Sequence, residues 1–287
     1  MNSQSFETLL VETESAVRTI TINRPESLNA LSTTVFAELG RALDQAATEL
    51  PAVRVIVLKG AGEKAFVAGA DVKEMTEMSQ AQAEARTWNG MRLYDKMRRQ
   101  PQPLVASIQG YALGGGMLLA IACDVRVAST RATFGYPEIR LGIIPGTGGT
   151  ILLDRLVGPA ASRAICLLGE HFPAERAYQL GIVNKLVPPE ELASETRRVA
   201  ATLAGYSPVA LKELKHALNA SLERDFEGAR AEEIAAYGRV FASEDRREGT
   251  RAFVEKRKPV FKGRYRSGAV RDEVIDVDTE SRCQPAV

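Results

Sequence analysis

The sequence has few residues of the types that carry metal, disulfide or nucleophilic chemistry. It contains three cysteines and two histidines in 287 residues. Cys123, Cys166 and Cys283 lie far apart and form no CxxC pair, which excludes a zinc ribbon or a thioredoxin-type site. Two histidines are too few for a three-histidine metal site. We expect His171 to lie in a turn and His216 on the surface. We therefore predict no bound metal and a reducing compartment.

Charge of one sign and long apolar runs are also missing. Lys and Arg number 37 against 36 Asp and Glu, a net charge of +1, which excludes a strongly basic nucleic-acid-binding protein. The longest apolar stretch, about residues 111–123, is shorter than the ~20 residues that a membrane-spanning helix needs. The start of the chain lacks the basic and apolar pattern of a signal or transit peptide. We expect a cytoplasmic protein that does not bind membranes.

Hydrophobic residues make up 45% of the chain, enough for a sizeable core. Strand-like and helix-like segments alternate in the first two thirds, which predicts an α/β architecture of stacked ββα turns. Expected strands cover residues 16–23, 53–60, 103–108 and 124–129, and expected helices cover 33–50 and 80–99. Further helices are expected over 190–204, 207–221, 226–242 and 244–257, with Ser207 as a cap and Pro208 at the first helical position.

We divide the chain into three parts. Residues 1–204 form the predicted α/β core, and residues 205–266 form a helical region. Residues 267–287 are polar, charged and aperiodic, so we expect a disordered tail.

Two glycine-rich segments, residues 65–71 and 110–116, each follow a strand and open a helix. No phosphate-binding GxxxxGK[ST] or GxGxxG pattern is present. The first turn of a helix leaves backbone N–H groups unpaired. Two such bends facing one pocket would form an oxyanion hole. The alternative is that the glycines only permit close packing.

A third segment, residues 134–146, places Glu138 in an apolar and turn-rich stretch. Burial there would raise the pKa of its carboxyl group and suit it to acid–base catalysis near neutral pH. The alternative is a surface glutamate that caps the next turn.

Together these segments closely resemble the enoyl-CoA hydratase/isomerase family, the crotonase superfamily. The resemblance extends from about residue 16 to residue 263. It includes RPESLNAL (24–31), AFVAGADVKEM (65–75), QGYALGGG (109–116), FGYPEIRLGIIPGTGG (134–149) and AFVEKRKPVFKGR (252–264).

The resemblance implies a crotonase-like spiral of ββα turns with a C-terminal helical trimerisation region, as a homotrimer or a dimer of trimers. It implies an acyl-CoA thioester substrate and no cofactor other than the coenzyme A of that substrate. The backbone N–H groups of Ala70 and Gly115 would bind the thioester oxygen, and Glu138 would be the acid and base. The expected substrate- and CoA-binding residues are Ser27, Leu28, Ala30, Ala68, Asp71, Val72, Leu113, Pro137, Gly146, Lys258, Phe261 and Lys262.

One departure from the family pattern bears on the reaction. Hydratases of this family use two glutamates, 20 residues apart, to hold the attacking water. Here Leu118 stands 20 residues before Glu138, at the position of the first glutamate. A single carboxylate suffices to move a proton between two carbons, so we expect an enoyl-CoA isomerase that converts 3-enoyl-CoA to 2-enoyl-CoA.

Two other interpretations stay open. A hydratase or lyase could use Glu138 alone, with water held by the Gly146 backbone N–H. The chain could also be a non-catalytic acyl-CoA-binding protein, although a pure binder would not need a buried base.

Overall fold

In residues 6–265, which the computed structural model describes, ten strands form two sheets. The six-stranded sheet has the order β1 (Leu9–Glu14), β2 (Val17–Ile22), β3 (Val55–Gly60), β5 (Leu104–Ile108), β7 (Val125–Ser129), β10 (Lys185–Val187). The four-stranded sheet has the order β4 (Ala65–Val67), β6 (Tyr111–Leu113), β8 (Thr133–Gly135), β9 (His171–Pro173).

Each successive pair of strands along the chain contributes its first strand to the large sheet and its second strand to the small sheet. β3, β5 and β7 pair in parallel in the large sheet, while the strands that follow them, β4, β6 and β8, pair in parallel in the small one. Each pair leads into a helix, which is α2 (Gln80–Arg99), α3 (Gly115–Ile121) or α4 (Gly149–Leu168). The predicted spiral of ββα turns is confirmed. Only the outer pairings β1–β2 and β8–β9 are antiparallel among the described strands.

Helices cover both faces of the large sheet. On one face α1 (Thr33–Thr48), capped by Ser32, buries an apolar stripe of Val35, Leu39, Leu43 and Ala46. On the other face α6 (Leu192–Ala204) packs against the sheet and closes a second apolar cluster. That cluster includes Val55, Val57, Val105, Val127, Leu192 and Val199.

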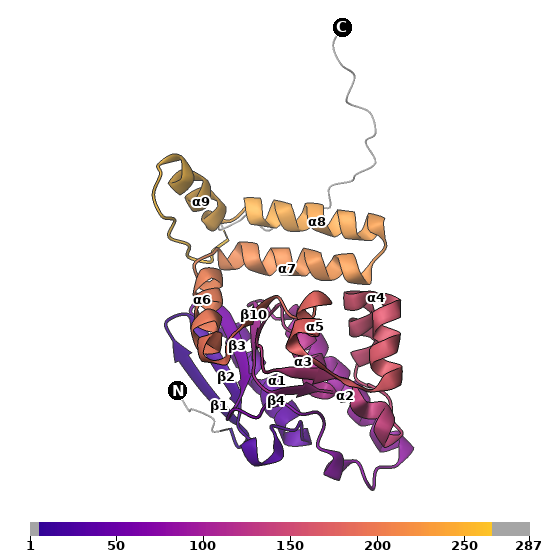
Figure 1. Ribbon diagram of the computed structural model, residues 1–287. Helices are drawn as coiled ribbons and strands as arrows, with labels where there is room; N and C mark the ends of the chain where they lie inside the picture. Colours follow the sequence, from indigo (N-terminus) through magenta and orange to yellow (C-terminus); the bar gives the residue numbers. More distant parts are fainter. Residues whose placement is uncertain (1–5, 266–287) are drawn as a thin grey trace.

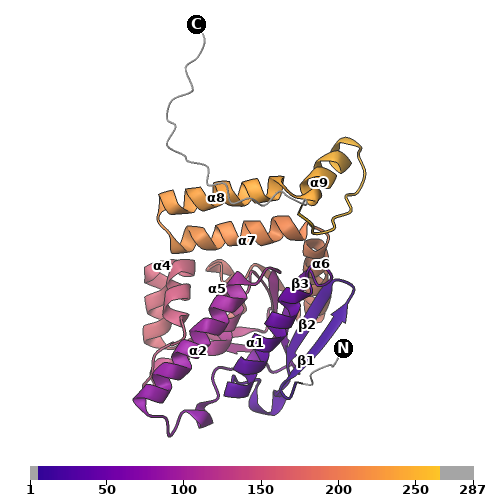
Figure 2. The same cartoon turned by 180° about the vertical axis from the view of Figure 1, so that it is seen from behind.

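The remaining helices of the C-terminal part are α7 (Pro208–Glu223), α8 (Phe226–Phe241) and α9 (Glu244–Val254). Figures 1 and 2 show α7 and α8 side by side at one end of the molecule, with α9 beyond them. Ser207 caps α7 by accepting a hydrogen bond from the Ala210 N–H at 3.1 Å, and Pro208 follows it, as predicted. Several large apolar side chains of α8 remain exposed: Ile234, Tyr237 and Phe241.

Four local expectations were wrong. The apolar spacing in residues 80–99 predicts an inward stripe of Trp88, Met91, Tyr94 and Met97, but Trp88 is 58% exposed. His171 lies in β9 rather than in a turn. Cys123 and Cys166 stand in apolar runs that predict burial; Cys123 is buried, but Cys166 is only half-buried. The short helix from Asp71 is a single 3-10 turn, η2 (Val72–Glu74).

Further predictions from the sequence concern the tail, membrane-spanning segments and metal sites. The predicted disordered tail, including Cys283, lies outside the described residues. No helix in residues 6–265 has the length and apolar character needed to cross a bilayer. Within the same range, no group of three or more His, Cys, Asp or Glu side chains is arranged to hold a metal ion.

Candidate active site

The three motifs found in the sequence meet at one cavity of about 350 Å³. Its wall includes Ala68 and Ala70 after β4, Gly114 and Gly115 at the start of α3, and Glu138. Parallel pairing of β4, β6 and β8 places the ends of these strands next to each other, so segments more than 60 residues apart in the sequence share one wall. Successive turns of the spiral therefore build the site.

The two predicted oxyanion-hole residues lie close together. A Cβ atom at Gly115 would stand 3.9 Å from the Ala70 nitrogen and 3.1 Å from the Leu31 side chain. Leu31 forms a bridge with the Ala70 segment, because its N–H donates to the Gly69 carbonyl and its own carbonyl accepts from the Asp71 N–H. Within residues 6–265, neither the Ala70 nor the Gly115 N–H donates to a protein acceptor. Both donors are thus available to one ligand oxygen.

Glu138 lies on the short 3-10 helix η3 (Pro137–Leu141), which follows β8. A Cβ atom at Gly114 would approach its Oε1 atom to 2.6 Å and would displace the carboxyl group, and the φ of +51° at Gly114 is strained for any other residue. The Oε2 atom is buried without a hydrogen-bond partner. Burial raises the pKa of Glu138 to about 7. A carboxyl group with this pKa can both take and return a proton near neutral pH.

The wall around Glu138 is otherwise uncharged on the side of α3. Leu118 is 1% exposed and lines the same cavity, so no second carboxylate faces the substrate from the position predicted by the sequence register. Tyr94 and Tyr136 are also buried in this wall, and Tyr94 donates a hydrogen bond to the Gly115 carbonyl at 3.2 Å. Burial raises the pKa of both phenols, so they remain protonated.

Four predicted binding residues also line this cavity: Ala68, Val72, Pro137 and Gly146. Four more of the predicted binding residues lie in or beside the loop next to the cavity: Ser27, Leu28, Ala30 and Asp71. The Ala68 N–H donates to the Leu28 carbonyl at 3.1 Å, and Arg24 joins that loop to Asp71 through an ion pair of 3.1 Å. Arg24 also donates to the carbonyl of Ala30 at 2.7 Å. Ser27 precedes Leu28 at the end of a 3-10 turn, η1 (Pro25–Ser27).

Two of the predicted binding residues have other surroundings. Leu113 is buried on β6 and is not part of the cavity wall. Leu28 also borders a larger cleft of about 880 Å³, which contains neither Glu138 nor the oxyanion-hole pair. Of these two cavities in the described residues, only the smaller one is lined by Glu138 together with Ala70 and Gly115, so it is the candidate active site.

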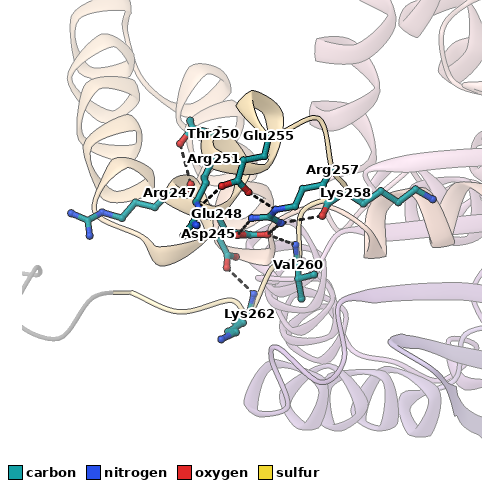
Figure 3. A network of polar contacts seen from close by, with 10 residues as sticks. All are labelled: Asp245, Arg247, Glu248, Thr250, Arg251, Glu255, Arg257, Lys258, Val260 and Lys262. Carbon is teal, nitrogen blue, oxygen red and sulfur yellow. Dashed lines mark hydrogen bonds and ion pairs between the residues drawn. The ribbon is translucent and has the colours of Figure 1, made fainter.

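The structure does not bring Lys258, Phe261 and Lys262 to this cavity within one chain. They follow α9, where Asp245 accepts from the Lys262 N–H at 2.8 Å and Phe261 packs near Gly249. Arg257 is paired with Glu248 and Glu255, and Figure 3 shows the Lys258 side chain extending away from this network. Their CoA-binding role stays a prediction, and it requires a neighbouring subunit.

Helix α2 contributes more to the cavity wall than Tyr94, which lies on the apolar stripe that the sequence predicts for this helix. Ala83, Thr87 and Tyr94 line the wall, and Gly90 lies close enough to Thr147 that a Cβ atom would clash. The spacing of these four positions puts them on one helical face, which is the signal that could have revealed it. Arg86 also lines the wall and donates to the Leu31 carbonyl at 3.2 Å, behind the oxyanion hole.

Comparison with known proteins agrees with the fold. The sequence is 38% identical over 250 residues to a short-chain-enoyl-CoA hydratase of Clostridium acetobutylicum, covering 87% of this chain and 95% of that protein. It is 37% identical to a crotonyl-CoA hydratase of Syntrophomonas wolfei, covering 90% and 98%. A crystal structure of an enoyl-CoA hydratase from Bacillus anthracis matches with a TM-score of 0.86 and 36% identity, covering 90% of this chain and all of that one.

These relatives have hydratase names, and they do not confirm the isomerase expected from Leu118. The sequence pattern of the family described as enoyl-CoA hydratase/isomerase matches residues 12–264, nearly the whole described chain. The chain belongs to the enoyl-CoA hydratase/isomerase family.

Proposed function

We propose that this protein hydrates a 2-enoyl-CoA thioester with Glu138 as its only side-chain acid and base. The observation that carries the proposal is the arrangement of the Glu138 carboxyl group in the same cavity as the free N–H groups of Ala70 and Gly115. The names of the relatives support hydration as the reaction.

The proposed steps follow from this arrangement. The thioester oxygen accepts hydrogen bonds from the Ala70 and Gly115 N–H groups. Glu138 takes a proton from a water molecule whose oxygen adds to C3, and the electrons of the C2–C3 double bond move to the thioester oxygen as an enolate. The two N–H donors stabilise that charge; loss of one such donor in other enzymes costs ~3–4 kcal/mol. Protonated Glu138 then returns the proton to C2.

Isomerisation of 3-enoyl-CoA to 2-enoyl-CoA is the second candidate. The buried Leu118 favours it, because an apolar residue at that position cannot hold water. The same carboxyl group would move one proton from C2 to C4, and the same enolate would form. Lyase chemistry with one glutamate uses the same groups.

Product analysis distinguishes these reactions. The purified protein is incubated with 2-enoyl-CoA and with 3-enoyl-CoA in separate assays. Formation of 3-hydroxyacyl-CoA from the first supports the proposal. Conversion of the second without hydration of the first supports the isomerase. Tight binding of both without turnover would indicate an acyl-CoA-binding protein and contradict both catalytic proposals.

Assembly and location are part of the proposal. We propose a homotrimer or a dimer of trimers that works in the cytoplasm. The exposed apolar side chains of α8 support the assembly, since they would be buried by neighbouring subunits.

A further inference from the structure

The cavity wall contains an unusual concentration of unpaired polar atoms. Among the described residues, four buried side-chain nitrogen or oxygen atoms have no hydrogen-bond partner. Three of them, Arg86 Nε, Tyr136 Oη and Glu138 Oε2, belong to residues that line the active cavity. Unpaired buried polar atoms lower the stability of the fold. Such atoms in a cavity wall indicate a bound group that completes their hydrogen bonds.

Tyr136 belongs to the same cavity wall as Glu138 and Gly146. It comes two residues before Glu138 and is 1% exposed. A Cβ atom at Gly149 would stand 3.3 Å from the Tyr136 Oη atom, and the Gly149 N–H donates to the Gly146 carbonyl at 2.9 Å. The phenol therefore lies beside the turn that contains Gly146. In the described chain, the Gly146 N–H donates to no backbone or side-chain acceptor.

Leu118 cannot hold water from the α3 side of the cavity, so a hydration reaction needs another polar group. We infer that the Tyr136 hydroxyl takes the place of the second carboxylate and holds the attacking water together with Glu138 Oε2 and the Gly146 N–H. Three hydrogen bonds are the usual number for a buried water molecule. This inference rests on the proposed hydration.

The hydrogen bonds balance in the following way. The water donates one O–H to Glu138 Oε2 and accepts from the Tyr136 O–H and the Gly146 N–H. When its proton goes to Glu138, the electron pair of the broken O–H bond stays on the oxygen and forms the bond to C3, while the C2–C3 π electrons move to the thioester oxygen. Glu138 later protonates C2. Tyr136 keeps its own proton throughout, because burial and the nearby Glu138 raise the pKa of its phenol. Tyr136 is thus a positioning residue for water.

The test is Tyr136→Phe, which removes one oxygen atom and keeps the ring. Because that oxygen has no protein partner, unfolding by denaturant should show equal or greater stability. Hydration of crotonyl-CoA should fall by about tenfold or more in kcat, since the water loses one of its three hydrogen bonds. Exchange of the C2 protons of butyryl-CoA with D2O needs Glu138 and the oxyanion hole but no attacking water, and should fall less than about threefold.

Tyr94→Phe is the matched control. This phenol contacts the Gly115 carbonyl rather than the proposed water, so its loss should lower exchange and hydration by similar factors. Tyr136→Phe with Leu118→Glu should recover part of the hydration lost in Tyr136→Phe alone.

Two outcomes overturn the inference and are separable from each other. If Tyr136→Phe hydrates as fast as the wild type, or loses both reactions equally, Tyr136 does not position the water. If the wild type exchanges C2 protons but does not hydrate crotonyl-CoA, the proposed function itself fails, and the inference fails with it.

Discussion

At the scale of single residues, the behaviour of Glu138 depends on its burial. We expect Glu138→Gln to lower kcat by ~10²–10⁴-fold with little change in substrate binding, because it removes the acid and base but keeps the size of the side chain. The wild-type rate should decline as pH falls below about 7, where the carboxylate becomes protonated. Steady-state kinetics over a pH series measures both effects. A variant that keeps most of its activity would contradict the assigned role.

The same shift in pKa affects stability. The folded protein holds the Glu138 proton up to about pH 7, whereas an unshifted glutamate releases it near 4.5. Between these values the folded state binds more protons than the unfolded state, so stability decreases as pH rises. Glu138→Gln should lack this part of the pH dependence, which thermal unfolding at several pH values would reveal.

Gly114 limits what can stand beside Glu138. Gly114→Ala should lower activity by about a hundredfold, because the new Cβ atom would displace the carboxyl group from its working position. Gly181→Ala is the control, since Gly181 also has a positive φ but a Cβ atom there would meet no other atom within 4 Å. Both variants should lose some stability in thermal unfolding, and only the first should lose activity to this extent. Equal activities would show that Gly114 does not position Glu138.

At the scale of elements, a half-buried ion pair ties α7 to the core. Lys215 lies 2.7 Å from Asp124, and it also donates to the Met97 carbonyl at 3.1 Å. Lys215→Met should cost about 3 kcal/mol of unfolding free energy, the lower end for a broken buried pair, because Asp124 is partly exposed. Denaturant unfolding measures this, with Lys212→Met on the exposed side of the same helix as the control. A cost equal to that of the control would contradict the role of the pair.

The elements also differ in how far the sequence predicts them. The bounds of α2 and the capped start of α7 agree with prediction, because Ser79 and Ser207 cap helices whose later residues favour helix. The sequence does not predict α4, because Gly158 and Pro159 interrupt its pattern; the helix is kinked there. It also does not predict β1, an edge strand whose exposed face removes the expected alternation.

The residues of the candidate site also differ in how well the sequence predicts them. Residues on tight turns beside the cavity are predictable, since glycine and a buried glutamate stand out in an apolar stretch. The side chains that α2 contributes are harder to predict, because they meet the cavity only after the chain has folded around it. Arg86 is an example: its contact with the Leu31 carbonyl joins positions 55 residues apart.

At the scale of the whole molecule, the exposed apolar side chains of α8 are where we expect another subunit to pack. Ile234, Tyr237 and Phe241 expose 54%, 65% and 46% of their surface. We expect sedimentation velocity to show a species of three or six times the 31.1 kDa chain mass, and Tyr237→Glu to shift it toward smaller species. A stable monomer at micromolar concentration would contradict this assembly.

The same assembly would bring the segment after α9 to a neighbouring cavity. Lys258→Ala with Lys262→Ala should raise KM for the CoA ester and leave kcat similar, because these contacts would be the same in the ground and transition states. Mixing this double variant with Glu138→Gln tests whether the lysines act across a subunit boundary. In mixed oligomers a site with Glu138 from the double variant can receive both lysines from a Glu138→Gln subunit, so active sites with low KM should reappear. An equal effect of the double variant on CoA and dephospho-CoA esters would argue against contact with the 3′-phosphate.

The pairing of β6 with β8 fixes the distance over which catalysis can occur. Leu113 stands opposite Gly135, and the Gly114 N–H donates to the Gly135 carbonyl at 2.8 Å, so the oxyanion loop and the turn that holds Glu138 leave the sheet side by side. A slip of one residue would move one turn past the other by about 3.3 Å, farther than a proton can be passed between fixed groups. Loops that contribute no residue to the cavity can therefore change in length, while the spacing within these two short strands sets whether the oxyanion loop and Glu138 can act on one substrate.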